Sequence, residues 1–102
     1  KLRKTFESEK ELTKTYGPKQ TKKIKRRMAE LEGAPSLAQV PAEPPPRCHA
    51  LKGDRKGHYA VDLQHPKRLI FRPEDRPPED AAGNPDLTAV TAIIITNVED
   101  YH

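Results

Sequence analysis

Hydrophobic and polar positions follow a helical period in the first third of the chain and an alternating period after residue 46. Four apolar residues of segment 2–16 fall on one stripe at helical spacing and predict a first helix: Leu2, Phe6, Leu12 and Tyr16. Gly17 and Pro18 are typical of a helix end followed by the first turn of another helix. The short connection predicts an antiparallel helical hairpin over residues 2–32.

In the second predicted helix, residues 18–32, Ile24, Met28 and Leu31 recur at i, i+4 and i+7 and are expected to face a core. The opposite face is expected to carry five cations at helical spacing: Lys19, Lys22, Lys23, Arg26 and Arg27. A cationic face attracts phosphate backbones without reading their sequence, so the residues of this stripe are candidates for binding RNA or the ribosome. A merely solvated helix face remains the alternative.

Residues 33–46 are rich in proline and predict an extended connector, in which "SLAQV" forms one helical turn. Four later segments are expected to be strands: "RCHALKG", "HYAVDL", "RLIFR" and "TAVTAIIITNV". The last is apolar almost throughout, as expected of a strand buried on both faces. Between the last two strands, residues 73–87 are rich in proline and acidic residues and predict an exposed loop.

Alternation also assigns faces to the predicted strands. Tyr59, Val61 and Leu63 are expected to share one side of their strand. Leu69 and Phe71 are expected to lie opposite Arg68 and Arg72 on the next one. Helices followed by strands predict a single α+β domain over residues 1–102, in which a helical hairpin packs on an antiparallel sheet at residues 47–102.

Charge is distributed unevenly around a net value of +4. Residues 1–32 carry 11 basic and 5 acidic side chains, residues 33–72 carry 7 and 3, and residues 73–102 carry 1 and 7. The single cysteine, Cys48, excludes an internal disulfide, and no segment approaches the roughly 20 apolar residues of a membrane span. We therefore expect a cytoplasmic protein with no membrane partner, whose basic part favours a nucleic acid.

The chemistry-bearing residues favour a reaction without a cofactor. The four histidines show no metal-ligand spacing, and no glycine-rich phosphate loop is present, so we expect neither a metal nor another cofactor. The remaining set is typical of a metal-independent ribonuclease: His49, Lys52, Arg68, Arg72, Tyr101 and His102. RNA carries its own 2′-hydroxyl nucleophile, so the enzyme supplies a base, an acid and cations that stabilise the phosphorane.

The segments "LKGDRKG" and "RLIF" and the terminal "EDYH" resemble the RelE/ParE superfamily of bacterial toxins, most closely the HigB-like branch of plasmid-maintenance killer proteins. The resemblance spans essentially the whole chain. It implies a ribosome-dependent mRNA endonuclease (mRNA interferase) that cuts the codon in the A site, as the toxin of a type II toxin–antitoxin system. It also implies a helix-turn-helix antitoxin as the partner, besides the ribosome and mRNA.

Six positions match the family's catalytic pattern by this resemblance: His49, Lys52, Arg68, Asp100, Tyr101 and His102. The tail is then expected to continue the last strand and to place His102 over the cleft. Three further cations, Arg55, Lys56 and Arg72, are expected to bind the RNA or the ribosome. Which residue acts as general base and which as general acid stays open.

The chain departs from the family in three ways. Members usually begin with a strand before the first helix, whereas this chain is expected to start in the helix, so we expect that strand to be missing and one sheet edge to lie open. Lys67 replaces an aromatic residue, and the loop at residues 73–87 is longer and more acidic than in compact members. Two alternatives remain: a ParE-like inhibitor of DNA gyrase that cleaves nothing, and a non-catalytic RNA- or ribosome-binding module.

Overall fold

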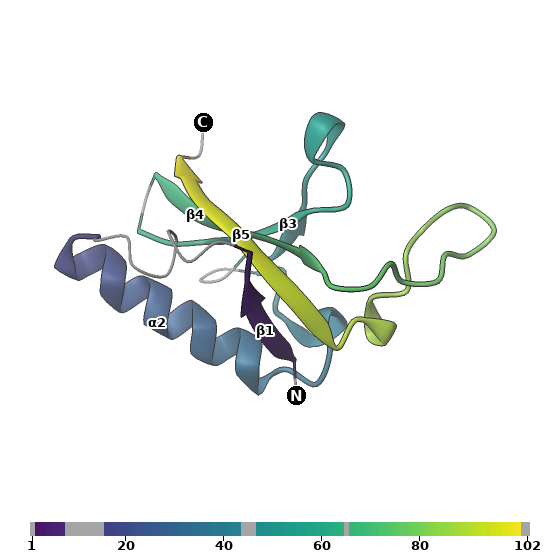
Figure 1. The fold of residues 1–102 in the computed structure, drawn as a ribbon, viewed down its shortest axis with the longest axis horizontal. Coiled ribbons are helices and arrows are strands. Elements are labelled where there is room, and N and C mark those ends of the chain that lie inside the picture. The colour runs from purple at the N-terminus through teal and green to yellow at the C-terminus, as the bar shows by residue number, and fades with distance from the viewer. Residues whose placement is uncertain (1, 8–15, 44–46, 65, 101–102) are drawn as a thin grey trace.

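The computed structural model describes residues 2–7, 16–43, 47–64 and 66–100. Within these ranges the protein is an α+β domain with one α-helix and a five-stranded sheet (Figure 1). In chain order the elements are β1 (Arg3–Phe6), α2 (Pro18–Gly33), η1 (Leu37–Gln39), β2 (His49–Ala50), η2 (Gly53–Arg55), β3 (Tyr59–Asp62), β4 (Lys67–Pro73), η3 (Leu87–Ala89) and β5 (Ala92–Asp100). The η elements are single 3₁₀ turns.

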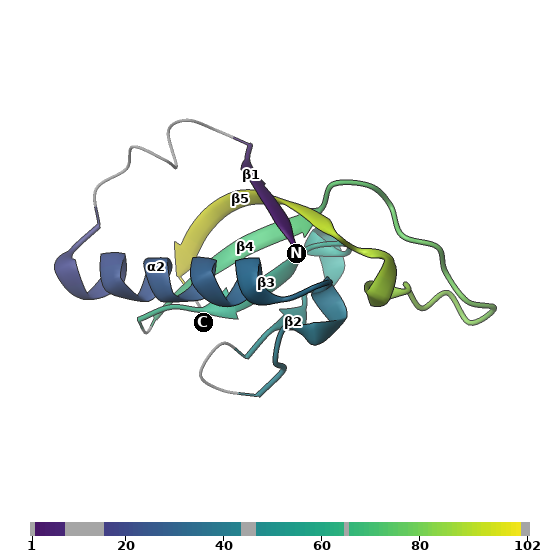
Figure 2. The same ribbon diagram turned by 90° about the horizontal axis from the view of Figure 1, so that it is seen from below.

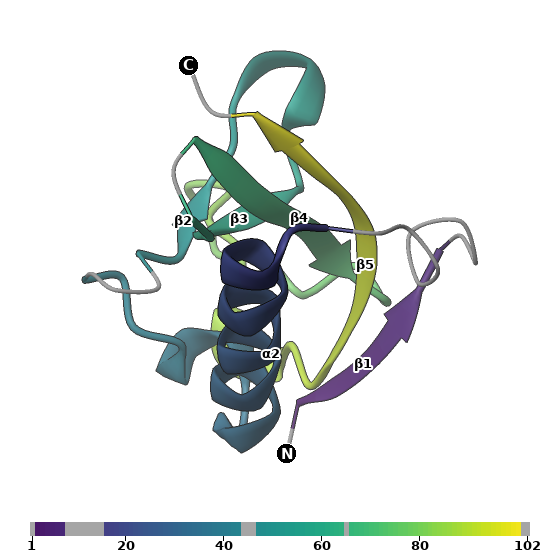
Figure 3. The ribbon, with the colours of Figure 1, turned by 90° about the vertical axis from the view of Figure 1, so that its left-hand side faces the viewer.

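The strands are ordered β1-β5-β4-β3-β2, and α2 lies across one face of the sheet (Figure 3). Strands β2 to β5 pair antiparallel, but β1 runs parallel to β5. The prediction of a wholly antiparallel sheet is therefore wrong at this edge, because the chain begins with a strand that the sequence pattern did not indicate.

That first strand also corrects the predicted hairpin of helices. Arg3–Phe6 pairs with Ala92–Ile95 of β5, so these residues are not helical. Leu2 is buried and Phe6 packs against the core. A separation of four residues fits one helical face, but it is also an even number and so fits one strand face equally well. The remainder of the predicted first helix, residues 8–15, lies outside the described residues.

The same strand overturns the expectation that an initial strand is missing. Arg3–Phe6 fills the position beside β5 that was expected to lie open. Its backbone is tied at both ends, since Leu2 N donates to Ala34 O at 2.8 Å and Glu7 N donates to Ile95 O at 2.9 Å. The start of the described chain is therefore joined both to the end of α2 and to the last strand.

Helix α2 confirms the second predicted helix. Pro18 occupies its first turn, where a missing backbone N–H costs nothing. Leu31 is fully buried, and Ile24 and Met28 are partly buried against the core. Figure 2 shows the helix running across the sheet. The apolar face indicated by the i, i+4, i+7 spacing is the one that packs against the core.

Arg27 contradicts its assignment to the solvent-facing stripe of cations. Its side chain is 2% exposed, its Nε donates to the backbone oxygen of Asp62 at 2.6 Å, and its Nη1 lies 2.7 Å from Oε1 of Glu30. Position 27 lies three residues after Ile24 and four before Leu31, on the buried side of the helix. The guanidinium therefore fastens α2 to the end of β3.

Alternation places the core as the sequence indicates. Tyr59, Val61 and Leu63 all join one buried cluster, as do Leu69 and Phe71. Stacking of the Tyr59 and Phe71 rings, with centroids 6.1 Å apart, joins β3 to β4. Each large side chain buried in this way contributes about 1.5–3 kcal/mol to stability, so the α2 face of the sheet supplies most of the hydrophobic stabilisation.

A β-bulge interrupts the pairing of β4 with β5. Ile70 pairs with Asn97, but the next residue, Phe71, pairs with Ile95, so Thr96 is an extra residue on β5. The extra residue changes which side chains of β5 face α2. Ile95 and, beyond the bulge, Val98 both contact the core. Ile94 is only half-buried, so β5 is not buried on both faces as its apolar sequence suggests.

The segments that connect these elements are short or exposed. "SLAQV" forms the 3₁₀ turn η1, while residues 44–46 of the proline run lie outside the described residues. Residues 75–86 are exposed apart from Pro77, and Figure 1 shows them extending away from the sheet. Asp80 organises this loop by accepting backbone hydrogen bonds from Ala82 and Asn84, both at 2.9 Å. No helix in the described part of the chain is long and apolar enough to cross a membrane.

We expect Arg27→Ala to lower the free energy of unfolding by about 2–4 kcal/mol, because it removes buried packing and strands the carbonyl of Asp62 and the carboxylate of Glu30. Lys22→Ala removes the same charge from an exposed position of α2 and should change stability by less than about 0.5 kcal/mol. Urea denaturation of both variants measures the difference. Equal stability of the two variants would contradict the anchoring role of Arg27.

Candidate functional site

The face of the sheet opposite α2 carries the polar side chains of the central strands. Residues paired directly across antiparallel strands share a face, so the register identifies this set without ambiguity. We call it the open face, and on β2 to β5 it comprises His49, Ala60, Asp62, Arg68, Ile70, Arg72, Ile94, Asn97 and Glu99. Most of its side chains are polar or charged, although Ala60 and Ile70 between them are fully buried, whereas those on the α2 side are mostly apolar.

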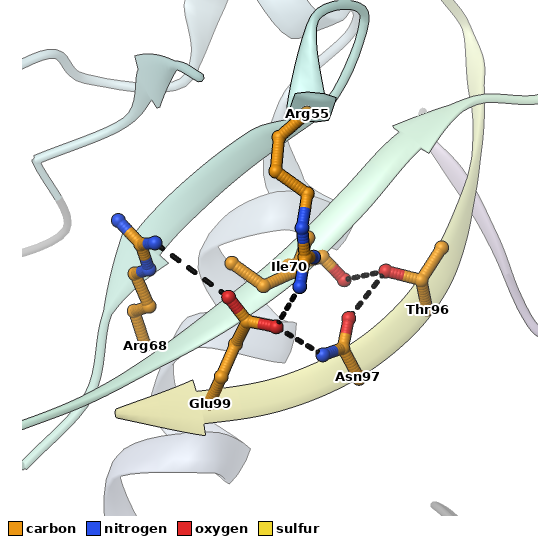
Figure 4. Close-up of polar contacts among 6 residues, drawn as sticks. All are labelled: Arg55, Arg68, Ile70, Thr96, Asn97 and Glu99. Carbon is orange, nitrogen blue, oxygen red and sulfur yellow. Dashed lines mark hydrogen bonds and ion pairs between the residues drawn. The ribbon is translucent and has the colours of Figure 1, made fainter. Parts of the chain in front are cut away.

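Two arginines meet one carboxylate on the open face (Figure 4). Arg68 lies directly across from Glu99, with Nη2 3.6 Å from Oε1. Arg55 reaches the other carboxylate oxygen from the turn between β2 and β3, where its Nη2 donates to Oε2 of Glu99. Glu99 thus bridges two guanidinium groups that are 13 residues apart in sequence and come from different elements.

Neighbouring polar groups hold the Glu99 carboxylate in its ionised form. Asn97 Nδ2 donates to Oε2 at 2.6 Å, and Thr96 on the bulge donates to Oδ1 of Asn97 at 2.8 Å. Burial alone would raise the pKa of Glu99. The hydrogen bonds from Asn97 and Arg55 and the charges of Arg55 and Arg68 outweigh burial and hold that pKa below its ordinary value.

The turn at residues 51–58 brings Arg55 to the open face. Gly53 and Gly57 have φ angles of 64° and 91°, which other residues adopt only with strain. Leu51 N donates to His58 O at 2.9 Å and closes the turn. Lys52 and Lys56 flank the 3₁₀ turn and are exposed. The "LKGDRKG" segment therefore presents three cations together, of which Arg55 is the one that contacts the sheet.

His49 lies on the open face with a defined ring orientation. Its Nδ1 is 2.7 Å from the backbone oxygen of Arg47. A carbonyl oxygen only accepts hydrogen bonds, so Nδ1 carries the proton and Nε2 is the basic nitrogen of the neutral ring. Arg47 has a φ of 46°, unusual for a residue other than glycine, and Asp62 holds its guanidinium by two bonds of 2.7 and 3.0 Å. Asp62 thereby helps to position His49.

The structure separates other residues that the sequence places in one site. His49 on β2 is level with Ile70 of β4, so Arg68 lies two strands away and two residues further along, more than about 10 Å from His49 in the plane of the sheet. Asp100 alternates with Glu99 and pairs with Lys67 at 2.6 Å, so it belongs to the α2 side of the sheet rather than to the open face. Arg72 is on the open face but 3.6 Å from the carboxylate of Glu7. Tyr101 and His102 lie outside the described residues.

The predicted basic stripe of α2 is reduced by one member. Lys19, Lys22 and Arg26 are exposed and Lys23 is half-buried, whereas Arg27 is buried beneath the helix. Helix α2 covers one face of the sheet (Figure 3), whereas Arg68 and its neighbour Arg55 lie with Glu99 on the other, so the cations of α2 are separated from these two arginines by the sheet. A single RNA phosphate cannot contact both groups, so the protein presents two separate cationic surfaces.

Neither metal ligation nor thiol chemistry is favoured at this face. In the ranges that the structure describes, no three histidine, cysteine or acidic side chains are grouped so that they could hold a metal ion. Cys48 packs against the core, and burial raises the pKa of its thiol to about 11, so it stays protonated near neutral pH. The available chemistry is therefore that of guanidinium, ammonium, carboxylate and imidazole groups.

Sequence reasoning missed the carboxylates that organise this site. Glu99 and Asn97 follow an apolar run in which alternation cannot be followed, and only the bulge at Thr96 turns them to the open face. Asp62 is the last residue of the otherwise apolar strand β3. A single acidic residue at the end of such a strand indicates an ion pair. Nothing in the sequence, however, indicates which cation it meets.

We expect Glu99→Gln to lower the free energy of unfolding by about 1 kcal/mol at pH 7, because two charge-assisted contacts weaken. The folded-state pKa of Glu99 lies below its ordinary 4.5, so the ionised group stabilises the fold above pH 4.5 and this contribution is lost as pH falls through the folded value. The difference between variant and parent should therefore shrink below pH 4.5 in urea titrations. Glu79→Gln in the exposed loop is the control, and a difference independent of pH would contradict the assignment.

The fold is similar to that of a chain in the solved YoeB–YefM complex from Staphylococcus aureus. The TM-score is 0.59 with 19% sequence identity, and the alignment covers 100% of this chain and 98% of that one. No protein-family model and no curated protein matches the sequence. At this identity the likeness shows a shared fold over essentially the whole of both chains, and the activity has to be argued from the open face.

Proposed function

We propose that this protein is the toxin of a type II toxin–antitoxin system and that it cleaves mRNA on the ribosome. The observation that carries the proposal is the pair of arginines, Arg55 and Arg68, that converge on one point of an open sheet face. The fold supports it, because the similar chain belongs to a toxin–antitoxin complex. The segments "LKGDRKG" and "EDYH" further favour a HigB-like branch of such toxins.

The chemistry requires an anion site beside a proton donor and a base. Arg68 and Arg55 hold the scissile phosphate and stabilise the charge that grows on its oxygens, and Lys52 supports them from the adjacent turn. His49 lies on the same face with its Nδ1 committed to the Arg47 carbonyl, but it is two strands away from Arg68 and is therefore the second proton-transfer candidate. Tyr101 and His102 follow β5 in sequence and supply the remaining proton-transfer groups, and no metal ion takes part.

The proposed partner is an antitoxin with a DNA-binding helix-turn-helix domain. The protein carries two cationic surfaces, on α2 and on the open face, which favour an acidic segment that binds across one or both. The similar chain was solved in a complex, which supports a partner of this kind. Such a segment neutralises the toxin when it covers Arg55 and Arg68.

We expect Arg68→Ala to reduce single-turnover cleavage of mRNA on programmed ribosomes by at least about 10²-fold, because the phosphorane loses a fixed positive charge. Arg76→Ala is the matched control. Arg76 lies in the exposed loop, 3.6 Å from Glu79, and its side chain is 84% exposed, so we expect this variant to cleave mRNA at the parent rate. Primer extension on a translated message maps the cuts. Absence of cuts with the parent protein despite ribosome binding would instead favour the non-catalytic binding module, and inhibition of DNA gyrase would favour the ParE-like alternative.

We expect the cations of α2 to bind ribosomal RNA rather than the scissile phosphate. Replacing Lys22, Lys23 and Arg26 together by alanine should weaken ribosome binding and reduce the slope of log affinity against log salt by about two to three units. Arg76→Ala is the control, because Arg76 is an exposed cation in the loop between β4 and β5 rather than on α2. If net charge alone determined ribosome binding, this single substitution would reduce the salt slope by a third as much as the triple variant does. Unchanged binding of the triple variant at low and high salt would refute the assignment.

A further inference from the structure

We propose that Glu99 is a tethered counterion: in the free protein its carboxylate occupies the position between Arg55 and Arg68 that an RNA phosphate takes when RNA binds. Binding is then an exchange of one anion for another at the same pair of guanidinium groups. This inference rests on the proposed function, because it assigns RNA to the open face. It adds a residue that limits the affinity of that face and that the sequence reasoning did not identify.

The contacts of Glu99 are those that a phosphate makes. One carboxylate oxygen accepts from Nη2 of Arg55 and the other lies 3.6 Å from Nη2 of Arg68, so two guanidinium groups share one anion through two separate oxygens. Phosphate presents its two non-bridging oxygens to arginine side chains in the same way. A carboxylate and a phosphate cannot both occupy this position, because their like charges repel at such short range.

The carboxylate is held in a way that permits its release. Its contacts are to side chains, from Arg55, Arg68 and Asn97, and the Glu99 side chain is 24% exposed. Arg55 is 42% exposed at the tip of a turn. A rotation of the Glu99 side chain toward solvent therefore vacates the position without moving the backbone of β5. Asn97 and Thr96 on the bulge favour the occupied state.

The tether changes the thermodynamics of RNA binding. A cation that binds a phosphate normally gives up a free ion to the solvent, and this release makes binding weaken as salt increases. At Arg55 and Arg68 the displaced anion is the Glu99 carboxylate, which stays attached to the protein. Its displacement therefore does not add the entropy that a free ion gains when it is released into solvent. The open face should therefore bind RNA more weakly, and with less dependence on salt, than two arginines without Glu99.

The test compares Glu99→Gln with the parent protein in binding a short single-stranded RNA whose 2′-hydroxyls are all methylated and which cannot be cleaved. Glutamine keeps the size and an acceptor oxygen but removes the charge. We expect the variant to bind about tenfold more tightly at low salt. The slope of log affinity against log salt should steepen by about 0.7, the value for one further phosphate contact on a single strand.

The matched control is Glu79→Gln, which removes the same charge from the exposed loop. It should leave the affinity and the salt slope at the parent values, since any effect of net charge alone would appear in both variants. Asn97→Ala is a second variant that keeps the charge of Glu99 but removes the hydrogen bond that holds it. It should raise affinity by a smaller factor and keep the proposal testable if Glu99→Gln fails to fold.

Three results overturn the inference: unchanged or weaker binding by Glu99→Gln, an equal gain in Glu79→Gln, and no measurable binding of this RNA by any of the proteins. Weaker binding would make Glu99 a residue that positions the two arginines. Because the RNA cannot be cut, these outcomes are independent of catalysis. If cleavage on ribosomes fails but Glu99→Gln binds more tightly with a steeper slope, the proposed nuclease is rejected and the tethered counterion stands.

Discussion

The antiparallel pairing of β4 with β5 contains one extra residue, Thr96, and the composition of both faces of the sheet depends on it. Side chains alternate along a strand, so an uninterrupted β5 would keep Asn97 and Glu99 on the side of Ile95, against α2. A carboxylate there would lose its contacts with Arg55 and Arg68. The bulge turns both residues to the open face and returns Val98 to the core.

The two faces of the sheet consequently differ in the interactions that hold them. The α2 side is packed with apolar side chains, and its one fully buried cation, among the described residues, is Arg27, which is satisfied by a carbonyl and by Glu30. The open side carries charges that are paired with each other but remain partly exposed. A face held by partly exposed ion pairs can exchange one anion for another with little effect on the packing beneath it.

The sequence pattern was sufficient wherever one period dominated. The apolar stripe of α2 and the alternation in β3 and β4 predict which side chains join the core cluster, because apolar residues repeat at the spacing of each element. They do not predict that Ala60 and Ile70, on the other face of the sheet, are fully buried as well. The first strand was missed because the spacing of Leu2 and Phe6 satisfies a helix and a strand alike. Arg27 was misplaced because charge was taken as a sign of exposure, although its position on the helix is a buried one.

The candidate site was predictable only in part, for a related reason. Alternation in the sequence predicts Arg68 and Arg72 on the face opposite Leu69 and Phe71, and the structure confirms it. The contact between Arg55 and Glu99 joins residues 44 positions apart through a folded turn and a bulge, and neither feature changes a local pattern. Asp100 was grouped with its neighbours in sequence, but adjacent residues of a strand point to opposite faces.

The pairing of Arg3 with Ala92 has a consequence for the order in which the protein can fold during its own synthesis. The first strand emerges from the ribosome before its partner has been made, and it stays unpaired while α2 and the β3–β4 hairpin form around a partial core. Such distant pairings are also the slow ones. The carboxylate at position 99 arrives with that last strand, so a nascent chain displays Arg55 and Arg68 before their internal anion is present. Any acidic partner translated nearby meets these two arginines at that stage, when its competitor is still absent.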